Sequence, residues 1–229
     1  MARTAVLAGI FLISGASALA FETLWFHQAH LTFGQSVWAS SLVLSAFMIG
    51  MALGNWLSGR YGRRVRSELA AYAGLELLVA FSGLALVYGL PGVGRAFAPL
   101  VQPLAAHPVL LNLLRLAGAW VLLVLPASAM GMTLPLLAQA AGHWDLNFGR
   151  VLGLLYGANT LGAVLGALLT ETFLLERWGV RGSALCAGAL NLVAAGAALL
   201  LWRVANQNAA QQPAAAPRSE EHTSELQSR

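Results

Sequence analysis

A few charged residues lie inside long apolar stretches of the sequence. Glu22, Glu76 and Arg115 are each surrounded mainly by alanine, leucine, valine and aromatic residues. A charge at the centre of a bilayer costs about 2.5–3.5 kcal/mol on insertion scales, so such residues pair with one another or serve a proton or ion path. Two carboxylates and one guanidinium can therefore form interhelical ion pairs, or a site for a proton or a small cation.

Glu22 lies close to the end of the first apolar stretch. It follows Ala5 by 17 residues, which is about 26 Å along a helix at 1.5 Å per residue. This depth predicts a position near the outer boundary of a membrane, with Trp25 in the aromatic belt and His27 and His30 beyond it. Metal binding there would need further ligands, so no metal site is predicted. We expect Glu22 to accept a hydrogen bond or an arginine from a neighbouring helix.

Glu76 and Arg115 are placed deeper than Glu22. Glu76 is about 10–12 Å inside the third apolar run, and Arg115 is about 9 Å inside the fourth. Both should face the interior of a helix bundle, with Arg115 paired to either glutamate. A site for a proton or a cationic substrate is the functional alternative, and snorkelling of the arginine to the interface is a third. Glu171 falls about 30 Å into the fifth run and should be interfacial.

The elements that must position these groups are membrane helices. The chain has 229 residues, of which 58% are hydrophobic and only 10% are charged, against roughly 25% charged in soluble domains. Six apolar runs are each long enough to cross a bilayer as a helix. The sequence therefore predicts an all-α, polytopic membrane protein with six transmembrane helices. The runs cover residues 5–24, 36–57, 69–90, 109–130, 151–175 and 183–201.

The basic residues, all of them arginine, indicate the orientation. Because cytoplasmic loops carry an excess of positive charge, both termini are predicted to be cytoplasmic in a bacterial inner membrane. Arginines confined to gaps between apolar runs do not indicate nucleic-acid binding. The predicted inner set is Arg3, Arg60, Arg63, Arg64, Arg66, Arg150 and Arg203, and the outer set is Arg95, Arg177 and Arg181.

The two ends of the chain need separate interpretations. The first run also has the basic start, apolar centre and Ala-Leu-Ala end of a cleaved signal peptide, and this alternative stays open for residues 1–20. Residues 1–205 are predicted to form the membrane domain, and the polar residues 206–217 a disordered linker. The segment "RSEEHTSELQS" resembles a translated sequencing adapter, so residues 218–229 are predicted to be non-biological; a genuine acidic tail is the alternative.

Small residues recur at helical spacing and predict close helix packing. Three small-xxx-small pairs remove side chains from one helix face; they are Gly50 with Gly54, Gly153 with Gly157, and Gly162 with Gly166. Such faces also leave homo-oligomer formation open. Pro126 and Pro135 predict a kink or an end in the fourth helix. The Pro- and Gly-rich residues 91–108 predict an outer loop.

The sequence contains no motif of a soluble catalytic site. A Walker loop, a zincin motif and a nucleophile elbow are all missing. No catalytic residue and no cofactor are therefore predicted for this chain, and the lipid bilayer is its predicted surrounding.

Several stretches together resemble bacterial membrane-anchored spermidine synthase-like proteins, also described as fused major-facilitator/spermidine synthases. The first helix is similar to the family's S/G-x-x-A-L-x-[YF]-E-x-L-W pattern, and "GMTLPLL" to its G-x-T-L-P-L-L segment. The fifth run is similar to G-R-x-x-G-x-L-Y-x-x-N-T-x-G-A-x-x-G. The matched residues are Ser17, Ala18, Leu19, Phe21, Glu22, Leu24, Trp25, Gly131, Thr133, Leu134, Pro135, Gly149, Arg150, Gly153, Leu155, Tyr156, Asn159, Thr160, Gly162, Ala163 and Gly166.

The resemblance implies half of a major-facilitator bundle joined to a cytosolic Rossmann-like domain. That domain would resemble a polyamine aminopropyltransferase, and this chain would lack it. Tyr156, Asn159 and Thr160 join the candidate intramembrane residues through the matched motif. The alternative function is a half-size transporter of a small cation or polyamine that acts as a dimer.

Overall fold

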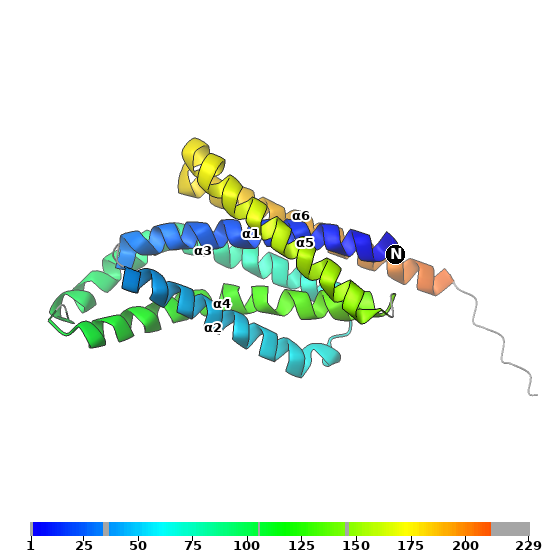
Figure 1. The fold of residues 1–229 in the computed structure, drawn as a ribbon, viewed down its shortest axis with the longest axis horizontal. Helices are drawn as coiled ribbons and strands as arrows, with labels where there is room; N and C mark the ends of the chain where they lie inside the picture. The colour runs from blue at the N-terminus through cyan, green and yellow to red at the C-terminus, as the bar shows by residue number, and fades with distance from the viewer. Residues whose placement is uncertain (1, 34–36, 105, 145–146, 212–229) are drawn as a thin grey trace, which may run out of the picture.

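The computed structural model describes residues 2–33, 37–104, 106–144 and 147–211, and these residues form helices without strands (Figure 1). The long helices follow the apolar runs, since a backbone in lipid must satisfy its hydrogen bonds within its own segment. They are α1 (Ala2–Phe33), α2 (Val37–Tyr61), α3 (Glu68–Val101), α4 (Pro108–Gly142), α5 (Phe148–Leu169) and α6 (Leu175–Gln211). Short helical turns are η1 (Gly62–Arg64), η2 (Gln102–Leu104) and the π-helical η3 (Thr170–Leu174).

Five helices in the described part of the chain are long and apolar enough to cross a membrane. This finding supports a multi-pass membrane protein, but the predicted count was six. The difference arises because α5, η3 and α6 follow one another without a loop, and the fifth span therefore has 60 residues. Only Gly179 departs from helical backbone angles there, with φ of 63°. The spans are Arg3–Gln28, Ser40–Arg64, Glu68–Ala96, Pro108–Gly142 and Phe148–Gln207.

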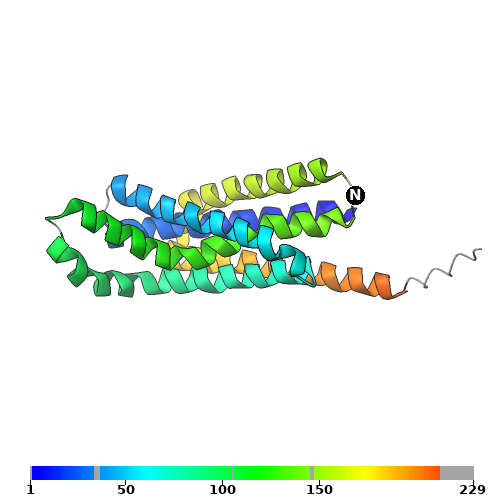
Figure 2. The ribbon, with the colours of Figure 1, turned by 90° about the horizontal axis from the view of Figure 1, so that it is seen from below.

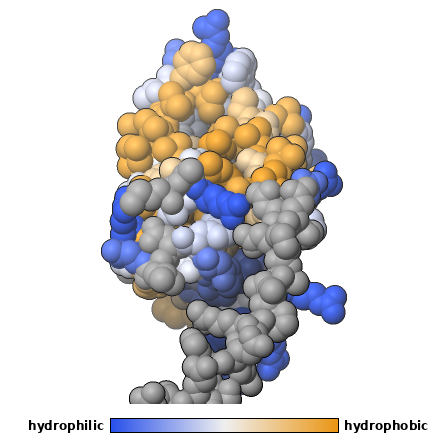
Figure 3. All heavy atoms as spheres, turned by 90° about the vertical axis from the view of Figure 1, so that its right-hand side faces the viewer, coloured by the Kyte–Doolittle hydropathy of each residue, from blue (hydrophilic) through white to orange (hydrophobic). Residues whose placement is uncertain are grey.

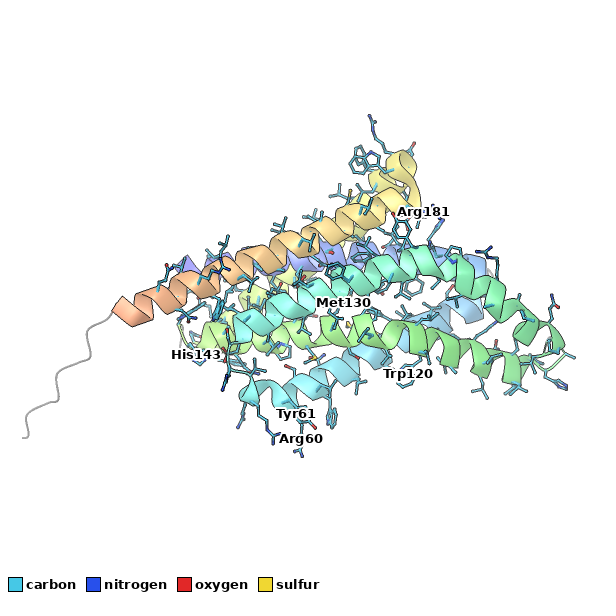
Figure 4. All side chains as sticks on the ribbon, turned by 180° about the vertical axis from the view of Figure 1, so that it is seen from behind. Arg60, Tyr61, Trp120, Met130, His143 and Arg181 are labelled. Atoms are coloured by element: carbon cyan, nitrogen blue, oxygen red, sulfur yellow. The ribbon has the colours of Figure 1, made fainter. Side chains whose placement is uncertain are left out.

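The long helices lie side by side along the long axis of the molecule (Figures 1 and 2). The beginning of α1 and the end of α6 lie at the same end of the molecule. The turn from α2 to α3 and the turn from α4 to α5 lie there as well. Arg60 and His143 lie toward that end in Figure 4, whereas Arg181, in the first part of α6, lies away from it. The first part of the predicted linker, residues 206–211, is helical and belongs to α6, so the disorder prediction is wrong there. The rest of the linker and the tail, from residue 212 onward, lie outside the described residues.

Two helix pairs are in backbone contact through glycines. A Cβ on Gly162 or Gly166 of α5 would collide with the backbone oxygens of Leu12 or Ala16 on α1. On α2, a Cβ on Gly54 would collide in the same way with Ser128 of α4. Small residues are what allow such approach. The pairs α1–α5 and α2–α4 are therefore held at backbone distance.

Not every predicted glycine pair contacts another helix of this chain. A Cβ on Gly50 would lie 2.6 Å from the Cβ of Ala127 on α4, so this position is also tight. A Cβ on Gly153 or Gly157 would meet nothing within 4 Å. The prediction that Gly153 and Gly157 pack helices together is therefore wrong within this chain, because α5 turns that face outward while Gly162 faces α1.

The core begins at the N-terminal end of the chain. Leu7, Ile10 and Phe11 are buried and pack with Tyr72 of α3 and Val151 of α5. The first span is thus an integral part of the bundle, as the membrane-helix interpretation of residues 5–24 requires. A second buried cluster surrounds Phe21, Leu24 and Trp25.

The prolines lie inside helices, so the alternative in which Pro126 or Pro135 ends the fourth helix is not what the structure shows. Pro91 and Pro99 lie inside α3, which runs to Val101, and Pro126 and Pro135 lie inside α4, which runs to Gly142. The predicted outer loop over residues 91–108 is therefore helical over much of its length. A proline in a membrane helix is tolerated when a neighbour satisfies the carbonyl that it leaves free.

Large apolar side chains cover the outside of the bundle. Phe81, Val121 and Leu200 are each more than 60% exposed. Seen end-on in Figure 3, hydrophobic residues gather over the upper part of the face and hydrophilic residues border them. An apolar outer surface around a packed interior is what a lipid environment favours.

Candidate functional site

A cavity of about 140 Å³ lies inside the bundle, and all six long helices contribute to its wall. We call it the inner cavity. The apolar part of its wall includes Phe47, Met51 and Met130, the last of which lies near the middle of the bundle in Figure 4. Its polar lining consists of Ser14, Glu22, Glu76, Thr133, Asn159 and Asn191. Two carboxylates from different helices thus line the same cavity.

Glu76 is the most deeply buried charged group at the site, with only 1% of its surface exposed. The Ser14 hydroxyl of α1 donates a hydrogen bond of 2.5 Å to its Oε1. Tyr72, one helical turn earlier on α3, is fully buried and meets Phe11 edge-on. Because a carboxylate has about four acceptor positions, the bond from Ser14 leaves capacity directed at the inner cavity.

Glu22 is half-buried on α1 and also lines the inner cavity. It makes no hydrogen bond or ion pair with any residue that the structure describes. The expected hydrogen bond or arginine from a neighbouring helix is therefore not formed. Its carboxylate is instead available to whatever occupies the cavity.

Arg115 does not pair with either glutamate. Its Nε is buried without a hydrogen-bond partner among the described residues. The reason is distance along α4. Met130 and Thr133 are the α4 residues at the inner cavity, and Arg115 precedes Met130 by 15 positions, about 22 Å along the helix. Within the described part of the chain, the one ion pair joins His143 and Glu68 at 3.2 Å.

Two asparagines face the inner cavity from α5 and α6. Asn159 can approach α1 because position 15 is glycine, since a Cβ there would lie 2.8 Å from Asn159 Oδ1. Asn191 is 1% exposed, and its Nδ2 has no partner among the described residues. A cavity of this size has room for a water molecule or a small polar ligand that can satisfy such an amide.

Asn191 did not stand out in the sequence analysis. The available signal was an amide within the otherwise apolar stretch "ALNLVAAGAALL". Tyr156 and Thr160 from the matched motif are exposed on the outer side of α5. Thr160 donates only to the Tyr156 carbonyl, at 2.9 Å. Of the three motif residues, the structure therefore brings only Asn159 to the cavity.

Trp25 is an interior residue and not a member of an interfacial belt. It is 2% exposed and stacks on Phe21 with ring centroids 5.7 Å apart. Its indole N–H donates to the Gly83 carbonyl of α3 at 3.4 Å. A side chain at position 83 would meet the Phe21 ring at 2.8 Å. The belt prediction is wrong because α3 offers an acceptor and a gap at this level.

Neither of the two histidines that follow Glu22 is among the described residues of the inner cavity. His27 is exposed, and the side chain of His30 lies outside the described residues. No group of three or more histidine, cysteine or acidic residues that could hold a metal occurs in the described part of the chain. The loop arginines Arg60, Arg63, Arg64 and Arg66 are exposed at the same end as His143.

The described residues form an all-α fold whose five long apolar helices are compatible with a multi-pass membrane protein, and these helices surround a cavity that carries polar groups in its wall. No family model, curated protein or solved structure matches this chain.

Proposed function

We propose that the chain crosses a bacterial inner membrane six times, with both termini in the cytoplasm. The 60-residue span Phe148–Gln207 would extend about 90 Å as one helix, whereas a hydrocarbon core is about 30 Å thick. Gly179 supplies the break at which this segment turns back. In support of the orientation, the described N-terminal end, the α2–α3 turn and the α4–α5 turn gather at one end. The inner-set arginines belong to these segments and to the final part of α6.

We also propose that this is the membrane domain of a spermidine synthase-like protein, on the strength of the matched motifs. Several motif residues have structural roles in this bundle, which supports the proposal. Gly162 and Gly166 contact α1, and Thr133 and Asn159 line the inner cavity. In this proposal a cytosolic aminopropyltransferase-like domain follows in cis. Sequencing the gene through its stop codon tests it, and a frame that stops soon after Pro217 would remove the fused-enzyme part.

For the membrane domain itself, the geometry favours the binding of a small organic cation. The observation that carries this proposal is that Glu22 and Glu76 line one enclosed cavity without a cationic partner among the described residues. Two carboxylates in a low-dielectric space favour a positively charged occupant. A cavity of about 150 Å³ admits a ligand the size of benzene, about six non-hydrogen atoms. A short aliphatic amine or diamine fits both the size and the charge.

Putrescine binding to the purified protein in detergent tests this function. Glu76→Gln should weaken binding about tenfold or more, because a hydrogen bond to a charged group contributes about 1.5–3 kcal/mol. Glu68→Gln is the matched control, since Glu68 lies on the same helix but outside the inner cavity. Equal affinities for the parent and Glu76→Gln would contradict the proposal.

Transport of the same cation is the second candidate. In this case the chain acts as a half-size transporter that dimerises, and the outward-facing Gly153 and Gly157 are free for contact with a second copy. Uptake of labelled putrescine into proteoliposomes distinguishes transport from binding alone. Uptake by the parent that Glu76→Gln reduces would favour a transporter, and binding without uptake would favour a membrane domain that only holds the cation.

A further inference from the structure

A second hollow lies on the outer part of α1, separate from the inner cavity. It has a volume of about 280 Å³ and is lined by Leu19, Glu22, Thr23, Phe26, His27 and Glu171. We call it the outer recess. Five of these residues belong to α1, whereas Glu171 belongs to η3, the π-helical turn after α5. His27 and Glu171 are exposed, so the outer recess opens to the surroundings of the bundle.

Two residues separate the outer recess from the inner cavity. Leu19 and Glu22 line both spaces, and they lie three positions apart on one face of α1. Each is only half-buried. The two spaces therefore adjoin at one turn of α1, and the side chains of Leu19 and Glu22 form part of the wall of each.

The charges of the outer recess favour a cation. Glu22 and Glu171 contribute carboxylates from two different elements, and neither has an ion pair with a described residue. His27 adds a polar ring and Thr23 a hydroxyl. A hollow lined by charge of one sign raises the local concentration of the opposite sign. The π-helical turn that carries Glu171 is also a type of backbone that occurs frequently at functional sites.

The inner cavity contains a buried amide whose hydrogen-bond donor has no partner among the described residues. Asn191 is 1% exposed, lines the inner cavity and has no partner for its Nδ2 among the described residues. Water or a hydrated ligand satisfies such a group, and that molecule must enter from outside the bundle. The outer recess shares two wall residues with the inner cavity, and so offers the access.

We infer that the outer recess is a second, outer binding site for a small organic cation, from which the cation passes Leu19 and Glu22 into the inner cavity. This inference rests on the proposed cation binding and adds its route. Glu22 serves both sites, Glu171 serves only the outer one and Glu76 only the inner one. The two sites can therefore be altered separately.

Cysteine reactivity tests the outer recess directly. Cys186 is the single cysteine of the chain, so Cys186→Ala provides a background in which Thr23→Cys is the only thiol. A cationic methanethiosulfonate reagent should modify this thiol about tenfold faster than an anionic reagent of similar size, because the carboxylates concentrate cations. Glu171→Gln should lower that ratio several-fold. Glu176→Gln, a neighbouring exposed glutamate outside the recess, should leave it unchanged.

Putrescine protection links the outer recess to the proposed function. Putrescine should slow modification of Thr23→Cys by the cationic reagent, and Glu76→Gln should leave this protection in place while weakening total binding. An unreactive Thr23→Cys, or equal rates with both reagents, in protein that still binds putrescine overturns the outer site and leaves the inner one standing. A cationic preference without any putrescine binding removes the proposed function and the route together.

Discussion

Gln28 of α1 donates a hydrogen bond of 2.9 Å from its Nε2 to the carbonyl oxygen of Val87 on α3. Val87 is the residue whose carbonyl would accept the backbone N–H of position 91 in a regular helix. Position 91 is proline, which has no N–H. The amide of Gln28 thus takes the place of the missing donor, and α3 continues past Pro91 to Val101.

This replacement predicts a dependence between positions 28 and 91. Gln28→Leu should destabilise the protein by about 1–2 kcal/mol, because it leaves a buried carbonyl without a donor. In a Pro91→Ala background the alanine N–H supplies the bond, so the same substitution should cost much less. Thermal unfolding of the four proteins in detergent gives the coupling energy. Strict additivity of the two substitutions would mean that Gln28 does not act through this carbonyl.

The hydrogen bond between Ser14 and Glu76 predicts a second stability effect. Ser14→Ala removes the donor at 2.5 Å and leaves a buried carboxylate less satisfied, which should cost about 1–3 kcal/mol. Ser45→Ala is the control, because the exposed Ser45 hydroxyl bonds only to Ser41 of its own helix. Unfolding midpoints in a denaturant titration compare the two variants. A loss of similar size in both would show that Ser14 has no special role.

The uneven packing of the glycines gives a third prediction. Gly54→Ala places a methyl group against the Ser128 backbone, and overpacking of this kind costs about 1–3 kcal/mol. At Gly157 the same methyl group meets nothing within 4 Å, and alanine should be neutral or up to about 1 kcal/mol stabilising in a helix. Thermal unfolding of the two variants under one condition measures the difference in their stability. Destabilisation by Gly157→Ala of the same size would instead indicate a contact with another molecule at that face.

The break at Gly179, near the beginning of α6, provides a fourth prediction. Gly179 has φ of 63° and ψ of −177°, a combination that is essentially confined to glycine and costs other residues about 1–3 kcal/mol. Gly179→Ala should therefore lower the stability of the hairpin, whereas Gly196→Ala, in open space on the same helix, should not. Hydrogen exchange of α5 and α6 amides measures the local effect. Unchanged exchange in Gly179→Ala would mean that this position tolerates another backbone conformation.

The sequence predicted the helices better than their ends. The apolar runs indicate where α1 to α6 lie, because length and hydrophobicity alone are needed for a span. The ends depend on contacts between distant residues. The loop prediction over residues 91–108 was wrong because the donor that supports α3 past Pro91 comes from Gln28, which is 59 positions from the Val87 carbonyl that it bonds. No local pattern around Pro91 contains that information.

The candidate site could be predicted only in part, because it too depends on contacts between distant residues. The cost of burying charge marked Glu22 and Glu76, which the structure places at one cavity. That cost could not decide the partner of Arg115, because the pairing depends on how far along α4 the cavity lies. Asn191 was missed since a single amide in an apolar run carries little penalty until its surroundings are known.

The glycine contacts also determine which motions the bundle permits. Because α1 and α5 touch through their backbones, as do α2 and α4, each pair should move as one rigid body. Displacement should then occur at the boundaries of these pairs and not within them. The inner cavity draws its wall from both pairs. Rocking of one pair against the other would widen or narrow the space around Glu22 and Glu76 while every glycine contact stays closed.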